Sequence, residues 1–237
     1  MAACAAAVAL RPGAVGLTGS VIGVSSLCLV TGAALAVYDW RVYPADQRPA
    51  LEGIALPVAA LGAFALVLAG TLDIRTRLVA AAITVAVCGG VPHLGGLRST
   101  GREGWGARFL RDAAAILVLV PVLLAAASQT LPLPLRAAVA LVGVGLVTVD
   151  GLQSEKTPRH HKVLLAVLTS LVVTGAMVGI DQAVTTPGVV AGATLVVWYG
   201  TRGVAENAAF TPRRWWSALE YLGVLAIALI GLHWVVR

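Results

Sequence analysis

The chain has 237 residues, of which 59% belong to the hydrophobic set and only 12% are charged, and its mean hydropathy is +0.90. A soluble domain averages roughly 45–50% apolar and about 25% charged residues, so this composition excludes an ordinary soluble fold and indicates that much of the apolar surface faces lipid. The net charge of +6 does not indicate nucleic-acid binding, because the basic residues lie in short segments between apolar runs, as in membrane proteins.

The apolar runs predict an all-α, polytopic transmembrane helix bundle of about eight spans. A helix needs about 20 apolar residues to cross a bilayer core, and a backbone in lipid must satisfy its hydrogen bonds internally. The runs also lack the alternation of a transmembrane barrel. Within a single integral membrane domain over residues 1–237, the expected spans are 14–38, 51–71, 78–92, 109–127, 133–149, 163–180, 187–203 and 215–236. The sequence does not fix the ends of the third and seventh spans.

Prolines and glycines inside the spans indicate where helices bend or pack closely. Pro57 and Pro121 lie inside the second and fourth spans, where a proline removes a helix hydrogen bond and kinks the helix. The four-residue spacing that lets two helix backbones approach closely occurs at Gly19–Gly23 and at Gly188–Gly192. We interpret these glycines as helix packing within the chain, with contact to a partner subunit as the alternative.

The connections between the spans are of two kinds. Residues 93–108 contain five glycines and are predicted to form an irregular surface loop. Residues 128–134 and 181–187 are short and carry little charge. Each of these two segments therefore predicts an antiparallel helix hairpin. No internal repeat relates the first four spans to the last four, which disfavours a transporter built from inverted repeats.

The distribution of positive charge predicts the orientation. With eight spans, one side of the membrane holds five positive residues, which are Arg11, Arg75, Arg77, Arg136 and Arg237. The other side holds twelve, which are Arg41, Arg48, Arg98, Arg102, Arg108, Arg111, Lys156, Arg159, Lys162, Arg202, Arg213 and Arg214. Because cytoplasmic segments carry the excess of Lys and Arg, the second side is expected to be cytoplasmic and both termini non-cytoplasmic.

Ionisable residues inside a membrane are candidate functional groups, but here none lies at the midpoint of a span. Glu220 is the deepest acid, Asp150 ends the fifth span, and Glu206 ends the seventh. The candidate catalytic residues are Glu220, Asp150, Glu206, His160, His161, Arg213 and Arg214. The alternative for Glu220 is an interfacial salt bridge beside Trp215 and Trp216, which would anchor the helix at the headgroups.

Metal and cofactor sites are not predicted. His160 and His161 are adjacent, but a metal site needs three or four ligands in suitable geometry. No two spans present an inward pair of histidines for a b-type haem, while a single-histidine pigment or haem ligand remains open. The three cysteines, Cys4, Cys28 and Cys88, form no CxxC motif and are interpreted as small buried side chains.

Motifs of common enzyme classes are absent from the sequence. It contains no P-loop, no HExxH and no GxSxG elbow. A stretch near the C-terminus, comprising residues 197–207, Arg213-Arg214 and Leu219-Glu220-Tyr221, resembles the end of an uncharacterised family of multi-pass bacterial membrane proteins. This resemblance covers about a fifth of the chain. It implies a membrane protein without an assigned activity, and no functional residue is carried over from it.

Three functions are consistent with these observations. The first is a structural or accessory membrane subunit of a larger assembly, in contact with anionic headgroups and with other membrane subunits. The second is a transporter or channel for a small or lipidic solute, with a polar cavity lined by Pro57, Pro121, Thr18, Ser20, Ser25, Ser26 and Thr31. The third is an intramembrane enzyme acting on a lipid or isoprenoid, in which the candidate catalytic residues converge at the cytoplasmic face. The compact loops indicate a prokaryotic inner membrane.

Overall fold

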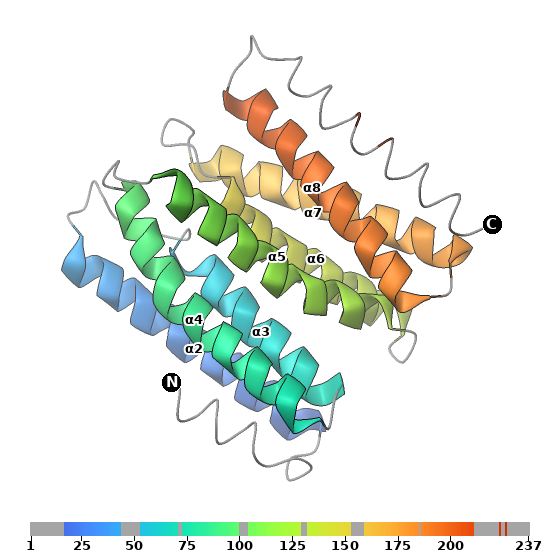
Figure 1. Cartoon of the computed structure of the whole chain (residues 1–237), viewed down its shortest axis with the longest axis horizontal. Helices are drawn as coiled ribbons and strands as arrows, with labels where there is room; N and C mark the ends of the chain where they lie inside the picture. The colour runs from blue at the N-terminus through green and yellow to red at the C-terminus, as the bar shows by residue number, and fades with distance from the viewer. Residues whose placement is uncertain are drawn as a thin grey trace. The chain divides into compact units, whose positions relative to one another are not determined.

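The computed structural model describes residues 17–43, 53–70, 73–99, 104–128, 132–152, 159–184 and 186–210, together with Gly223 and Ala226. These residues form seven helices and no strand (Figure 1), which confirms the predicted all-α class. The helices are α2 (Leu17–Val42), α3 (Ala55–Gly70), α4 (Ile74–Ser99), α5 (Trp105–Ala127), α6 (Leu133–Gly151), α7 (Arg159–Ala183) and α8 (Pro187–Phe210). The expected eighth span lies outside the described residues, apart from Gly223 and Ala226, which are helical.

Four of these helices are long and apolar enough to cross a membrane, and they are found in the ranges Ile74–Leu97, Trp105–Ala127, Leu133–Gly151 and His160–Ala183. A shorter apolar helix covers Ala55–Val67. A membrane protein is therefore supported by the length and composition of these elements, while the number of spans stays a prediction.

The chain divides into two compact units, the first from Met1 to Pro121 and the second from Val122 to Arg237. In the first unit, α3 packs against both α2 and α4. The sequence of α3 explains this position, because it has no charged residue and its buried side chains are mostly small alanines that allow close approach. Phe64 of α3 packs against Ala81 of α4. The thiols of Cys28 and Cys88 lie near the carbonyl oxygens of Val58 and Pro57, at 3.9 and 3.7 Å.

In the second unit, α7 packs against both α6 and α8, and α6 also contacts α8 (Figure 1). Only residues 184–186 separate α7 from α8, so the two helices form the antiparallel hairpin predicted from the short segment 181–187. Val144 and Val147 of α6, Val173 of α7 and Trp198 of α8 are fully buried and belong to the apolar core. The unit therefore has two ends, one with the α7–α8 turn and one with the C-terminal turns of α6 and α8.

Two local predictions differ from the structure. Helix α4 continues through Pro92 to Ser99 and α5 begins at Trp105, so most of the segment predicted as a glycine-rich loop is helical. Gly96 is buried in this part of α4, and a Cβ there would overlap the Tyr43 side chain, so this glycine serves close packing rather than flexibility.

Pro57 does not lie in a helix interior either. It is the third residue of α3, where the backbone N–H would have no partner within the helix, so the proline breaks no hydrogen bond and the predicted kink does not arise there. Pro121 does lie inside α5, as predicted.

Candidate functional site

The end of the second unit that contains the last turns of α6 and α8 holds a buried polar contact. The indole Nε1–H of Trp198 donates a hydrogen bond to Thr148 Oγ1 at 2.9 Å, and both side chains are almost completely buried. This bond fixes α8 against α6 at one depth, since a buried indole N–H without an acceptor would be costly. We call this region the Arg202 end, after the charged residue one turn beyond Trp198.

Arg202 crosses from α8 to the end of α6. Its Nε donates to Glu206 Oε1 at 2.8 Å, and its Cζ lies 5.4 Å from the centroid of the Trp198 ring, within the range of a cation–π contact. A Cβ at Gly151 would lie only 2.7 Å from Arg202 Nε. The absence of a side chain at Gly151 therefore leaves room for the guanidinium beside the α6 backbone. Arg202 thus lies next to Glu206 and Trp198 of its own helix and next to Gly151 of α6.

The candidate catalytic residues can now be placed. Asp150 is buried in the last turn of α6, and Glu206 is half-buried beside Arg202, so both lie at the Arg202 end as the sequence indicated. His160 and His161 are exposed in the first turn of α7, at the same end, with ring centroids 4.3 Å apart. Glu220, Arg213 and Arg214 lie outside the described residues. The convergence of the whole set on one pocket stays a prediction.

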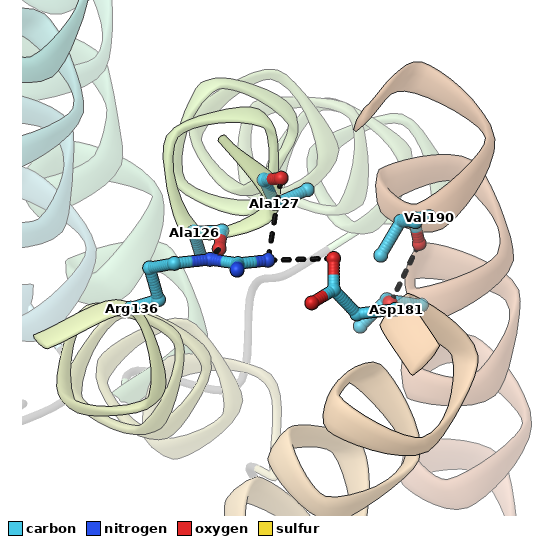
Figure 2. Close-up of polar contacts among 6 residues, drawn as sticks. Ala126, Ala127, Arg136, Asp181 and Val190 are labelled. Atoms are coloured by element: carbon cyan, nitrogen blue, oxygen red, sulfur yellow. Dashed lines mark hydrogen bonds and ion pairs between the residues drawn. The ribbon is translucent and has the colours of Figure 1, made fainter. Parts of the chain in front are cut away.

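The opposite end of the second unit is held by an ion pair that the sequence analysis did not identify. Figure 2 shows Arg136, in the first turn of α6, between the end of α5 and Asp181 of α7. Its Nε donates to the carbonyl oxygen of Ala126 at 2.7 Å, and its Nη2 donates to the carbonyl of Ala127 at 3.3 Å and to Asp181 Oδ1 at 2.6 Å. The side chains of Arg136 and Asp181 are 7% and 15% exposed.

These contacts explain why an arginine occurs at an unfavourable position. A positive charge in the first turn of a helix opposes the helix dipole, so Arg136 receives no support from α6 itself. It is stabilised by Asp181 and by two carbonyls from the last turn of α5, which have no partner within that helix. One guanidinium thus joins three helices. We call this region the Arg136 end.

The first unit has buried polar side chains of a different kind. Thr31 and Asp39 lie two turns apart on one side of α2 and are 2% and 4% exposed. Within the described part of the chain, neither the Thr31 hydroxyl nor either carboxylate oxygen of Asp39 has a hydrogen-bond partner. Tyr43 follows one turn later, its ring 6.3 Å from that of Tyr38. Burial raises the pKa of Tyr43, and the nearby Tyr38 and Asp39 raise it further.

A second ionisable group of the first unit lies in the connection between α3 and α4. Asp73 accepts hydrogen bonds from the backbone N–H and the hydroxyl of Thr76, at 2.9 and 2.6 Å, and thereby caps the N-terminus of α4. These bonds lower the pKa of the Asp73 carboxyl from its ordinary value of 3.8. The residue is exposed, and its role in the structure is to start the helix.

Metal and cofactor ligands do not gather in the described ranges. No group of three or more His, Cys, Asp or Glu side chains lies together there. His93, His160 and His161 are all exposed, and His233 lies outside the described residues. A single-histidine pigment or haem ligand is therefore not provided by any interior histidine among those described.

Sequence reasoning missed Arg136, Asp181, Thr148 and Trp198 as interacting groups, and it missed Asp39 as a buried one. For Arg136 a signal exists: it follows Pro132 and Pro134 at the start of an apolar run, where a charge gains nothing from its own helix. For Thr148 and Trp198 no such signal exists, because their contact depends on how α6 and α8 cross. Comparisons of the chain with known protein families, with curated proteins and with solved structures find no match.

Proposed function

We propose that this chain is a structural or accessory integral membrane subunit of a larger membrane assembly, within a prokaryotic inner membrane. Its support begins in the second unit, where Arg136 and Trp198 use their polar atoms to connect helices of the same chain, and where Arg202 is paired with Glu206 of its own helix. Residues engaged in this way stabilise a scaffold. They are not presented to a substrate.

The observation that carries the proposal is a pair of exposed glycines on α7. Gly175 and Gly179 are exposed, four residues apart, with no atom within 4 Å of the position of a Cβ on either. Leu164, Leu168 and Leu171 continue the same helix face and are also exposed. Lipid chains can cover leucines, but two glycines at this spacing form a groove into which another helix backbone fits closely. We call this face the α7 groove and assign it to a helix of a partner subunit.

The membrane surface is the second partner. Trp105 and Phe109 stack at the start of α5 with centroids 5.7 Å apart, and both are exposed. Aromatic rings of this kind are enriched at the level of the headgroups. They occur on the side that the charge distribution assigns to the cytoplasm, where anionic headgroups meet basic residues.

The proposed orientation is supported by the uneven distribution of Lys and Arg, with five on one side and twelve on the other. The excess of these residues is expected on the cytoplasmic side. Multi-pass topology with both termini outside the cytoplasm is part of the same proposal.

The test is purification of the full chain from its native membrane in a mild detergent, followed by native mass spectrometry. We expect a stoichiometric complex with at least one other membrane subunit. Replacement of both groove glycines, Gly175→Leu with Gly179→Leu, should abolish the complex, because the leucines fill the groove while the open space above them leaves the chain itself intact. A lone chain with a bound lipid or small molecule would contradict the proposal.

A matched control is available on α4. Gly89 and Gly90 are exposed and have equally open surroundings, so Gly89→Leu with Gly90→Leu adds the same apolar volume elsewhere. We expect this variant to keep the complex. If both double variants lose the partner to the same extent, the α7 groove is not the binding face.

A transporter or channel is the alternative that one observation favours. Thr31 belongs to the polar side chains of the first expected span that were predicted to line a cavity, and its buried hydroxyl has no partner within the described residues. A lone chain that co-purifies with a small or lipidic solute, and loses it in Thr31→Val, would favour this alternative. The enzyme alternative depends chiefly on Glu220, Arg213 and Arg214, which the structure does not describe.

A further inference from the structure

The side of α2 that faces the interior of the first unit becomes increasingly polar toward the C-terminal end of the helix. Cys28, Thr31 and Asp39 lie on this side, and the Cys28 thiol contacts the carbonyl of Val58 in α3. Thr31 and Asp39 are shielded from water almost completely, as their exposed fractions of 2% and 4% indicate. A carboxyl group is thus enclosed where the neighbouring helix offers it no charge.

Among the described residues, few ionisable groups lie near Asp39. Tyr38 of α2 and Tyr43, which directly follows this helix, are the nearby titratable residues, and the side chain of Arg41 is exposed. Helix α3 contains no ionisable residue at all. In α4, the ionisable residue one turn before the contact between Gly96 and Tyr43 is His93, whose side chain is exposed. In the described ranges, no cationic side chain and no hydrogen-bond donor reaches either carboxylate oxygen.

An ionised carboxylate in this setting would be strongly disfavoured. Removal from water without a counter-charge or a donor favours the neutral form of an acid. Two kinds of cation could neutralise the group, a proton or a metal ion. A metal ion needs several oxygen ligands, and no cluster of ligating side chains occurs in the described part of the chain. A proton needs only the carboxylate itself.

We propose that Asp39 is a proton-binding site in the interior of the first unit, occupied at neutral pH. The carboxylate takes a proton from water to form the neutral acid, and it returns the proton when a donor or a cation reaches it. Asp39 directly follows the first expected span and is flanked by Tyr38 and Trp40, both exposed, which places it near the headgroup level. This site does not depend on the accessory-subunit function.

The experiment uses the full chain in its native membrane and a lipid-soluble carbodiimide, which adds to protonated carboxyl groups. Peptide mass spectrometry then measures the labelling of each acid as a function of pH. Asp39 should be labelled at neutral pH, roughly tenfold more than Asp73, the exposed and ionised aspartate of the same unit. Half-labelling of Asp39 should occur at a pH well above that of Asp73.

Other outcomes would overturn the proposal. Labelling of Asp39 only in acid, in parallel with Asp73, would mean that the group is ionised and paired. Protection by sodium but not by choline at constant pH and ionic strength would identify a metal cation as the occupant. If the reagent reaches Asp39 at no pH, infrared difference spectra decide: a protonated-carboxyl band at neutral pH that disappears in Asp39→Asn supports the site, and its absence refutes it.

Discussion

Two sets of buried polar groups, one in each unit, differ in whether they have partners. In the second unit, Arg136 is paired with Asp181, and Trp198 donates to Thr148, so charges and donors are matched across helices. In the first unit, Thr31 and Asp39 are equally buried but lack such partners within the described residues. Both units bury apolar side chains between packed helices, so these residues can be compared in similar surroundings.

This difference separates two uses of a polar residue in an apolar interior. A matched group fixes the position of its helix, because any shift leaves a donor or a charge unsatisfied. An unmatched group contributes nothing to position and lowers stability, so its presence points to another use, such as binding a proton. The second unit therefore has the properties of a scaffold, and the first contains the site that deserves chemical tests.

The largest effect is expected at the Arg136 end. Arg136→Met removes the partner of Asp181 and the donors to Ala126 and Ala127, and should lower the free energy of unfolding by about 3–5 kcal/mol, as for other broken buried pairs. Unfolding of the purified chain in detergent, followed by tryptophan fluorescence, measures the change.

The double variant Arg136→Met with Asp181→Leu is the matched control. It removes both charges, so no uncompensated carboxylate remains and a large part of the lost stability should return. If the single variant unfolds like the original chain, or the double variant is less stable than the single one, the ion pair is not what holds this end together.

A smaller change in the free energy of unfolding is expected from replacing a buried threonine by valine, and its direction should differ between Thr148 and Thr31. Thr148→Val removes the acceptor of the Trp198 N–H and should cost about 1–2 kcal/mol. Thr31→Val has the same shape change but removes a hydroxyl that has no partner in the described residues, so stability should stay the same or rise by about 1 kcal/mol. The same unfolding assay compares the two.

Thr174 makes this comparison sharper. It lies in the second unit, on α7, yet its buried hydroxyl has no partner among the described residues. If a hydrogen-bond partner decides whether the loss of a threonine hydroxyl raises or lowers stability, Thr174→Val should change stability in the same direction as Thr31→Val. If Thr174→Val is as destabilising as Thr148→Val, the two units differ in packing rather than in hydrogen bonding, and the comparison fails.

The helices of this fold were predictable from the sequence because each of them coincides with a continuous run of apolar residues. Helix ends were less predictable. Glycine and proline at residues 92–96 indicated a loop, but Gly96 lies inside α4, where its lack of a side chain leaves room for Tyr43. Pro57 suggested a kink, and its place in the first turn of α3 depends on where that helix begins.

The polar sites were predictable only in part, for the same physical reason. Asp150 and Glu206 could be assigned to one end of the bundle, since each ends an apolar run. Their neighbours could not, because Arg136 and Asp181 are 45 residues apart, and Trp198 and Thr148 are 50 apart. Such pairs depend on how the helices cross. The pattern of apolar residues within one helix contains no information about this crossing.

The smallest change in stability is expected from replacing Asp73, because this residue is exposed and solvent screens its charge. Its pKa is lowered in the folded chain by the bonds from Thr76, so its stabilising contribution is present above the ordinary value of 3.8 and is lost as the pH falls through the lowered pKa. The stability difference between the chain and Asp73→Ala should therefore shrink in acid. Asp73→Asn keeps a capping side chain without a charge and should remove this pH dependence. A difference that is constant from neutral to acid pH would show that the cap acts through geometry alone. In that case the charge of Asp73 contributes nothing measurable to the stability of the first unit, and the side chain acts only as the hydrogen-bonding cap of α4.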